Sequence, residues 1–329
     1  MISLKTWGVL AGLAAALIAP SLAAAQTWSK PVRLLTPNPP GSASDLALRG
    51  IAEVMSKATG QTFFVENRPG ASGTIAGQAC ASAAPDGQTF CLLDAFNSAL
   101  SPAIFNNMPF DTKNDLMPVV LLGFFPSGLW VNKDVPINSA EELLELARKQ
   151  PGKINFATFG AASSSSIYVA WLKNVRGIEM TNVSYKSALD AFRAVIGGEA
   201  QVASYAMGPG LANSKPGELK LVAVNNPTRL PAFPNVPTFE EAKLSAVLAW
   251  FGLFAPKGTP QAVIDRINSE VVKGLIQNPE TKKRFLDAAG IEPTGPAGGT
   301  PAEFAKFFES EISVYARMVK EAGIEKIDR

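Results

Sequence analysis

Short β-rich runs alternate with stretches of helical periodicity along most of this 329-residue sequence. After the run PVRLLT at 31–36, apolar residues recur at the i, i+3, i+4 and i+7 spacing of one helix face. These residues are Leu48, Ile51, Ala52 and Met55. The later strand-like runs are TFFVEN (62–67), TFCLLD (89–94), MPVVLLGFF (117–125), GLWVNK (128–133), INFATF (154–159), TNVSYK (181–186), AQVASYAM (200–207), LKLVAV (219–224) and LAWFGLFAP (248–256). This alternation predicts an α/β fold with largely parallel sheets.

The starts of two helices can be placed from capping residues. Ser139 and Glu142 have the S-x-x-E spacing of a capping box, and the helix that follows should end before Pro151. Ser72 can cap another helix, which we expect to run to about Ala83.

The length of the chain and the absence of a linker limit how many domains it can form and how they are connected. The chain is long enough for about two domains of ~150 residues each. Hydrophobic residues make up 47% of it, so it can bury a core. It has no fixed-period repeat and no long low-complexity linker. Two domains would therefore be joined by several short crossings, with one of them discontinuous in sequence.

Residues 1–25 have the pattern of an export leader. Lys5 gives a positive start, and the apolar run at 7–19 is short for a membrane-spanning helix. The three alanines at 23–25 supply a small-residue cleavage site. We therefore expect cleavage before Gln26 and a soluble periplasmic protein. An uncleaved anchor helix is the alternative.

The two cysteines lie on either side of the turn Pro85-Asp86-Gly87. Cys80 falls in a predicted helix and Cys91 in a predicted strand. We expect a disulfide between them because an oxidising compartment permits one. Two buried free thiols are the alternative, since the sequence does not give the geometry that a disulfide requires.

The sequence contains no histidine. Its absence removes histidine-based acid–base catalysis, Ser-His and Cys-His nucleophile pairs, and histidine-ligated metals. Two cysteines alone do not form a zinc site, and a formal charge of +2 gives no reason to expect nucleic acid. We therefore expect no catalytic residue, no metal, no cofactor and no nucleic-acid partner. The enzymatic alternative is a serine hydrolase using the serines at 163–166, with Lys186 or a carboxylate as the base.

The loop TPNPPGSASD at 36–45 is a candidate anion site. Ligands of open α/β sheets bind beyond the carboxyl ends of strands, where the next helix presents unpaired N–H groups that suit a carboxylate or phosphate. Gly41 lets the backbone approach a ligand closely. Ser42 and Ser44 offer hydroxyls, and Asp45 lies in the first turn of the helix. An ordinary capped loop is the alternative.

Other loops have the same character. FATFGAASSSS at 156–166 ends in four serines, which suit caps and ligand donors better than helix interiors. A flexible polar turn is the alternative there. A third loop, SYKSALDAF at 184–192, brings Tyr185 and Lys186 to the start of a helix, although such a lysine is more often an ordinary surface residue. A fourth loop, ENRPGASG at 66–73, contains Arg68, which either pairs with an anion or only braces the loop. If the loops at 36–45 and 156–166 face each other across a cleft, each can hold one end of a small anion.

Seven motifs, in this order, resemble the tripartite tricarboxylate transporter receptors, also called Bug or TctC-like extracytoplasmic binding proteins. The motifs are TPNPPGSASD, VENRPGASG, AAPDGQTF, PFDTKND, VSYKSALDAF, LVAVNNPTRLPAFPNVPTFEEA and WFGLFAPKGTP. The resemblance covers about residues 28 to 320. It implies an α/β fold of the type II periplasmic binding protein kind, in which two lobes enclose a ligand cleft. We expect residues 26–127 with 249–329 to form the first lobe and residues 128–248 the second.

The resemblance also implies a function and a site. It implies a solute-binding protein that captures a small organic carboxylate, such as a di- or tricarboxylate, for uptake by membrane permease subunits. A ligand-sensing module for a signalling partner is the alternative. The ligand-binding residues carried over from the family are Asn38, Pro40, Gly41, Ser42, Ala43, Asp45, Gly160, Ser163, Ser164, Ser165, Tyr185 and Lys186.

The sequence departs from the family pattern in three places. Ser166 stands where a histidine usually opens the second-lobe helix, and Tyr205-Ala206 occupy a stretch that often contains Phe-Asp. A missing carboxylate removes a partner for a ligand ammonium, so we expect a ligand without an amine. Asn38 stands where an aromatic residue is common, which gives no support to specificity for aromatic acids.

Overall fold

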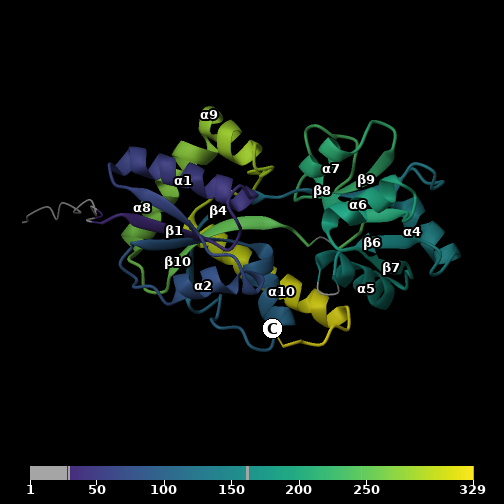
Figure 1. Ribbon diagram of the computed structural model, residues 1–329, viewed down its shortest axis with the longest axis horizontal. Helices are drawn as coiled ribbons and strands as arrows, with labels where there is room; N and C mark the ends of the chain where they lie inside the picture. The colour runs from purple at the N-terminus through teal and green to yellow at the C-terminus, as the bar shows by residue number, and fades with distance from the viewer. Residues whose placement is uncertain (1–27, 29, 161–162, 246, 329) are drawn as a thin grey trace, which may run out of the picture.

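Two five-stranded sheets form the centres of two lobes that lie side by side (Figure 1). The structure is a computed structural model that describes residues 28, 30–160, 163–245 and 247–328, so the predicted leader lies outside the described residues. No helix within the described ranges has both the length and the apolar character needed to cross a membrane.

The first sheet has the strand order β2-β1-β3-β10-β4. Its strands are β1 (Val32–Thr36), β2 (Phe63–Asn67), β3 (Thr89–Asp94), β4 (Leu116–Phe124) and β10 (Trp250–Pro256). β1 pairs in parallel with β2 and β3, whereas β10 is antiparallel to both β3 and β4. Successive residues of a strand face opposite sides of a sheet. Leu34 accordingly packs against the α1 and α8 side, and Leu35 against the α2 and α10 side.

The second sheet has the order β7-β6-β8-β5-β9, which repeats the pattern of the first. Its strands are β5 (Ser127–Asn132), β6 (Asn155–Thr158), β7 (Thr181–Ser184), β8 (Val202–Ala206) and β9 (Leu219–Asn225). β5 is antiparallel to β8 and β9. In each sheet the antiparallel strand is the one that arrives directly from the other lobe. Each sheet is therefore mixed, with one antiparallel strand among parallel ones. The sequence did not predict this strand, because periodicity does not reveal where the chain crosses between the sheets.

Helices cover both sheets. The longer ones are α1 (Ala43–Thr59), α2 (Thr74–Ala81), α4 (Ala140–Lys149), α5 (Ser164–Arg176), α6 (Ala188–Ile196), α8 (Gln261–Val271) and α10 (Pro301–Glu321). The shorter segments are η1 (Ala71–Gly73), η2 (Phe96–Leu100), α3 (Ser101–Ile104), α7 (Met207–Asn213), η3 (Val272–Ile276), α9 (Pro279–Thr281) and η4 (Lys282–Asp287).

The predicted helix starts are only partly right. Ser139 caps α4 through its hydroxyl, which accepts from the Glu142 amide at 3.1 Å. The Glu142 carboxylate, however, accepts from the Asn138 amide rather than from that of Ser139, so the reciprocal half of the box does not form. A complete capping box forms at the start of α10, between Thr300 and Glu303. The prediction for Ser72 was wrong, because α2 begins at Thr74 with Gly73 as its N-cap.

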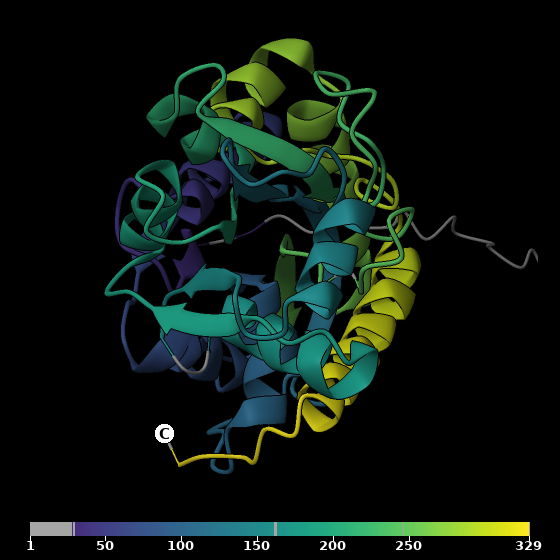
Figure 2. The same ribbon diagram turned by 90° about the vertical axis from the view of Figure 1, so that its right-hand side faces the viewer.

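The last long helix bridges the lobes. α10 packs against one face of the first sheet and extends to α5 of the second lobe. It appears in yellow along one flank of the molecule in Figure 2. The Trp171 indole donates to the Glu321 carboxylate at 2.9 Å, and Asn174 Nδ2 donates to the Ala322 carbonyl at 2.9 Å. Tyr315 Oη donates to the Leu248 carbonyl at 2.7 Å. α10 thus ties the α5 helix and the returning crossing segment to the first lobe.

Cys80 of α2 and Cys91 of β3 form a disulfide, with Cα atoms 6.0 Å apart. Both side chains are fully buried. In the chain-entropy account a bond that closes so short a loop stabilises the fold by about 2–3 kcal/mol.

We expect reduction of the disulfide, or replacement of both cysteines by alanine, to lower the melting temperature by about 3–5 °C. Calorimetry with and without a reductant measures this, and the double-alanine variant should not respond to the reductant.

Glu311 of α10 is buried, and its carboxylate accepts from the Trp250 indole at 3.0 Å. Burial raises its pKa to about 7. The folded state then holds this proton more tightly than the unfolded state, so stability falls as the pH rises from about 4.5 to 7. Above pH 7 the buried charge of Glu311 lowers the free energy of unfolding by about 3 kcal/mol.

We therefore expect Glu311→Gln, which can still accept from Trp250, to melt higher than the parent protein at pH 8 by about 5 °C. The difference should shrink at pH 5 and vanish near pH 4. A difference that stays constant from pH 4 to pH 8 would contradict the raised pKa.

Candidate functional site

A cavity of about 270 Å³ lies where the second sheet meets the segments that cross between the lobes. Strands β6, β8 and β9 end at this cavity, and helices α5 and α6 begin there. Phe125, Val247 and Ala249 of the crossing segments complete its wall. The position agrees with the rule that ligands of α/β sheets bind beyond the carboxyl ends of strands.

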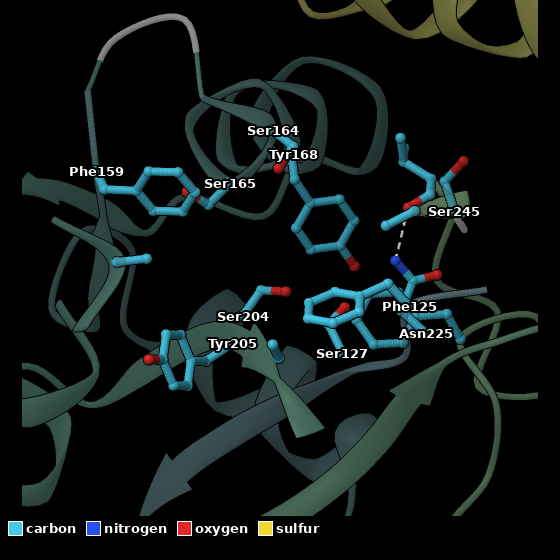
Figure 3. A pocket seen from close by; sticks show the side chains of 15 residues that line it. Phe125, Ser127, Phe159, Ser164, Ser165, Tyr168, Ser204, Tyr205, Asn225 and Ser245 are labelled. Carbon is cyan, nitrogen blue, oxygen red and sulfur yellow. Dashed lines mark hydrogen bonds between the residues drawn. The ribbon is translucent and has the colours of Figure 1, made fainter. Parts of the chain in front are cut away.

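The wall of the cavity is aromatic and carries no formal charge (Figure 3). Five of its side chains are aromatic rings: Phe125, Phe159, Tyr168, Tyr205 and Phe239. The polar side chains are those of Ser127, Ser164, Ser165, Ser204, Asn225 and Ser245. No lysine, arginine, aspartate or glutamate is among the described residues that line it. A ligand here would be held by hydroxyls, amides and rings.

The start of α5 supplies hydrogen-bond donors to this cavity. Ser163 is the N-cap, and its hydroxyl accepts from the Ser166 amide at 3.2 Å. The Ser166 hydroxyl donates to the Gly160 carbonyl at 2.8 Å, which ties the loop to the helix. The amides of Ser164 and Ser165 have no acceptor within the described part of the chain. Unpaired amides and the positive end of the helix dipole attract an anion.

Two buried polar atoms at the cavity also have no partner among the described residues. They are the Tyr168 hydroxyl and Asn225 Oδ1. Tyr168 is 5% exposed, and burial raises the pKa of its hydroxyl, which therefore stays protonated. Asn225 Nδ2 donates to the Val247 carbonyl at 2.7 Å, whereas its buried oxygen has no partner among the described residues.

The first predicted loop has a well-defined internal structure. Asp45 is buried, and its carboxylate accepts from the Gly41 amide at 3.0 Å, from Arg49 Nε at 2.9 Å and from Asn67 Nδ2 at 3.0 Å. Burial raises the pKa of Asp45, but the hydrogen bonds from Arg49, Gly41 and Asn67 outweigh this and lower it. Asp45 therefore acts as a brace for the loop in this conformation.

The other predicted residues of this loop also have structural partners or lie in solvent. The Ser42 hydroxyl caps α1, accepting from the Asp45 amide at 3.3 Å, and Ala43 opens that helix. Asn38 Nδ2 donates to the Ser44 hydroxyl at 2.9 Å. Pro40 and Gly41 are exposed, and Gly41 has a φ of +83°. The loop lies on the side of the first lobe that faces the second (Figure 1), but none of its residues lines the cavity.

The remaining predicted residues divide between the cavity and its surroundings. Ser164 and Ser165 line it, and Ser163 holds the start of their helix. The Gly160 amide donates to the Ser184 hydroxyl at 2.9 Å. Tyr185 packs against the core of the second lobe, and Lys186 is exposed; neither lines the cavity.

Sequence reasoning missed most of the aromatic wall. Phe159 follows β6, Asn225 ends β9 and Tyr205 is the next-to-last residue of β8, so the rule applied to loops could have found them. Tyr168 lies four residues after Ser164, which places both side chains on one face of α5. Phe239 comes from the return segment, and nothing in its local sequence points to the cavity.

Comparisons with known proteins agree on one family. The model described as "Tripartite tricarboxylate transporter family receptor", TctC, matches residues 47–324. A UPF0065 protein of Bordetella bronchiseptica is 35% identical over 307 residues, which are 90% of this chain and 90% of that protein.

Two solved structures share the two-lobed α/β fold. An R. palustris protein solved with adipate is 28% identical, with a TM-score of 0.71, and the match covers 91% of this chain and 99% of that one. MatC from Rhodopseudomonas palustris, solved with bound malate, is 28% identical with a TM-score of 0.67, covering 88% and 99%. The resemblance carried by the seven motifs is thus confirmed, and the chain belongs to the tripartite tricarboxylate transporter receptor family.

Proposed function

We propose that this protein is an extracytoplasmic receptor that captures a small organic carboxylate and delivers it to the membrane permease subunits of its transporter. The observation that carries the proposal is the start of α5, where the unpaired amides of Ser164 and Ser165 open into a cavity without formal charge. The similar proteins solved with adipate and malate support the same ligand class. Export by cleavage of the leader before Gln26 is part of the proposal.

Electrostatics favours an anion and disfavours an amine in this cavity. A carboxylate gains from charge-assisted hydrogen bonds to amides and hydroxyls, which are roughly twice as strong as neutral ones. An ammonium would be buried without a counter-charge, because no aspartate or glutamate is among the described lining residues. We therefore keep the expectation of a ligand without an amine.

The first loop joins the site in our proposal when the lobes close. The lobes, taken as residues 26–127 with 249–329 and residues 128–248, would turn about the crossing segments near 125–126 and 247–249. This motion would bring Asn38, Pro40, Gly41 and the α1 start towards Ser163–Ser165. Closure removes water from the cleft and strengthens each hydrogen bond to the anion.

A thermal-melt screen tests the ligand class. Protein refolded to remove any copurified ligand would be melted with about thirty small carboxylates. A ligand at 100 times its Kd adds ~2.7 kcal/mol of stability, which is a shift of about 4 °C for a chain of this size. The absence of any shift across the panel would contradict the proposal.

Ser164→Pro removes one of the two unpaired amides. Ser164 is the first residue of α5, where proline is well tolerated. The residue before it, Ser163, has φ −72° and ψ 151°, an extended conformation that can precede a proline. We expect a folded variant whose affinity for the hit from the screen falls about tenfold to 100-fold, because a hydrogen bond to a charged group is lost. Ser164→Ala is the matched control, since it removes the hydroxyl and keeps the amide. Titration calorimetry of both variants would locate the effect, and an equal loss in the two would contradict the role of the amide.

Gly41→Val tests the first loop. Gly41 has a φ of +83° with nothing within 4 Å of an added Cβ, so the change strains the backbone and places a branched side chain over the loop. We expect it to abolish ligand binding while the protein stays folded. Gly217→Val is the control, because Gly217 has a φ of +86° and equally open space in an exposed loop of the second lobe. Unchanged affinity in the Gly41 variant would remove the first loop from the site.

A further inference from the structure

We propose that Glu311 of α10, which does not line the cavity, controls the affinity of the cavity for its carboxylate ligand. The receptor takes up a proton at the Glu311 carboxyl group as it binds, and its affinity falls when that group ionises. Glu311 is a positioning residue, because it acts through the chain segment it holds and through its charge. The inference rests on the proposed carboxylate-binding function and adds a form of regulation to the same site.

α10 holds the crossing that returns from the second sheet on both sides of a cavity-lining residue. Tyr315 Oη donates to the Leu248 carbonyl at 2.7 Å, and the Trp250 indole donates to the Glu311 carboxylate at 3.0 Å. Ala249, which lies between these two attached residues, is part of the cavity wall. The state of the Glu311 carboxyl group is therefore one residue of backbone away from the wall.

The same face of α10 also comes close to the anion-binding end of the cavity. Tyr315 and Ser164 line one narrow gap between α10 and the start of α5, together with Val247. Glu311 lies four residues before Tyr315, so the two side chains are one helical turn apart on one face. A carboxylate held by the Ser164 amide would thus lie within about 15 Å of the Glu311 carboxyl group.

Glu311 is buried, and no cation beside it contributes to its pKa in the described part of the chain. β4, β10, η2 and α3 pack against α10, and none of the four contains a charged residue. α8 touches α10 at its start, where Asn268 donates to the Gly299 carbonyl, about three turns from Glu311. The basic residues of α5 lie in its last turn, where Trp171 donates to Glu321 at the far end of α10. The charged residues of α10 closest to Glu311 are exposed: Lys306, Glu309 and Arg317.

Two titratable groups share the surroundings of Glu311, namely Tyr315 and Asp94 at the end of β3. Burial raises the pKa of Tyr315 well above its usual value, and the charges of Glu311 and Asp94 raise it further, so its hydroxyl stays neutral. Burial also raises the pKa of Asp94, but three hydrogen bonds from neighbouring residues oppose this rise. Among the described residues, the Glu311 carboxylate accepts from the Trp250 indole alone. Glu311 is therefore the carboxyl group that is least prepared to carry a charge.

The direction of the pH effect follows from like-charge repulsion. Burial raises the pKa of Glu311 to about 7 in the empty receptor. A bound carboxylate is a second negative charge, so binding raises this pKa further. At about pH 6 the group is mostly neutral with and without ligand, and the affinity is highest there. Above the raised pKa the ionised group repels the ligand, and we expect an affinity about threefold to tenfold lower.

Titration calorimetry between about pH 6 and pH 8.5 tests the inference. The titrants are adipate, malate and the carboxylate that gives the largest shift in the melt screen. We expect the affinity of the parent protein to fall about threefold to tenfold across this range. Near pH 7.3 binding should take up about 0.3–0.5 proton, which is read from the difference between buffers of unlike ionisation enthalpy.

Glu311→Gln keeps an acceptor for the Trp250 indole and cannot ionise. We expect this variant to bind at every pH about as tightly as the parent does near pH 6, and to lose the proton uptake. Comparison over the same pH range cancels the ionisation of the ligand itself. Glu309→Gln is the matched control, because Glu309 lies on the same helix with an exposed side chain that pairs with Lys113. This control should keep the pH dependence of the parent.

Three results would overturn the inference while leaving the carboxylate receptor intact. The first is a parent affinity that does not change with pH. The second is a Glu311→Gln variant that keeps the full pH dependence, even if it binds more weakly at every pH, since that would show a purely structural role. The third is loss of the pH dependence in Asp94→Asn, which would assign the proton to Asp94. Failure of every carboxylate to bind would instead refute the proposed function on which the inference depends.

Discussion

The passage of the chain between its two sheets determines where the other parts of the molecule lie. β4 ends at Phe124 and β5 begins in the other sheet at Ser127, and the chain returns to the first sheet between Asn225 and Trp250. Each strand that arrives by such a crossing runs antiparallel beside its neighbours. The crossings also form one wall of the cavity, so any rotation of the lobes would change the shape of the cavity directly. Hydrogen bonds to the carbonyls of Val247 and Leu248 fix the return crossing to each lobe.

The two glycine–serine loops look alike in sequence and differ in electrostatics. Both have a serine N-cap, Ser42 for α1 and Ser163 for α5. Three residues later α1 has Asp45, whose carboxylate already lies at the positive end of its helix. The same position in α5 is Ser166, which brings no charge. The first loop thus contains its own anion, whereas the second leaves that end of the helix dipole for an external one.

Local sequence signals predicted the local structure well. β4 and β5 lie within a residue or two of the predicted runs, and the serine cap of α5 was visible in the loop at 156–166. The mixed sheet order could not be predicted because it follows from the crossings, which leave no periodic signal. The cavity wall was missed for a related reason. Phe159, Tyr205 and Asn225 meet only after three strands have been placed in one sheet, and Phe239 lies outside any helix or strand, between β9 and β10. The half-formed box at Ser139 shows that even a correct cap motif leaves its second hydrogen bond open to a competing amide, here that of Asn138.

The position of β10 between β3 and β4 has a consequence for the order in which the chain matures. All strands of the second sheet lie within residues 127–225, so that sheet can be completed while the rest of the chain is still being made. The first sheet stays divided until residue 256 has emerged, although most of its strands are synthesised earlier. β3 and β4 therefore each keep an unpaired edge until β10 is in place, and unpaired edges are where strands of different chains join. The lobe that begins first is the last to be completed, and until then its open edges are where association between chains can start.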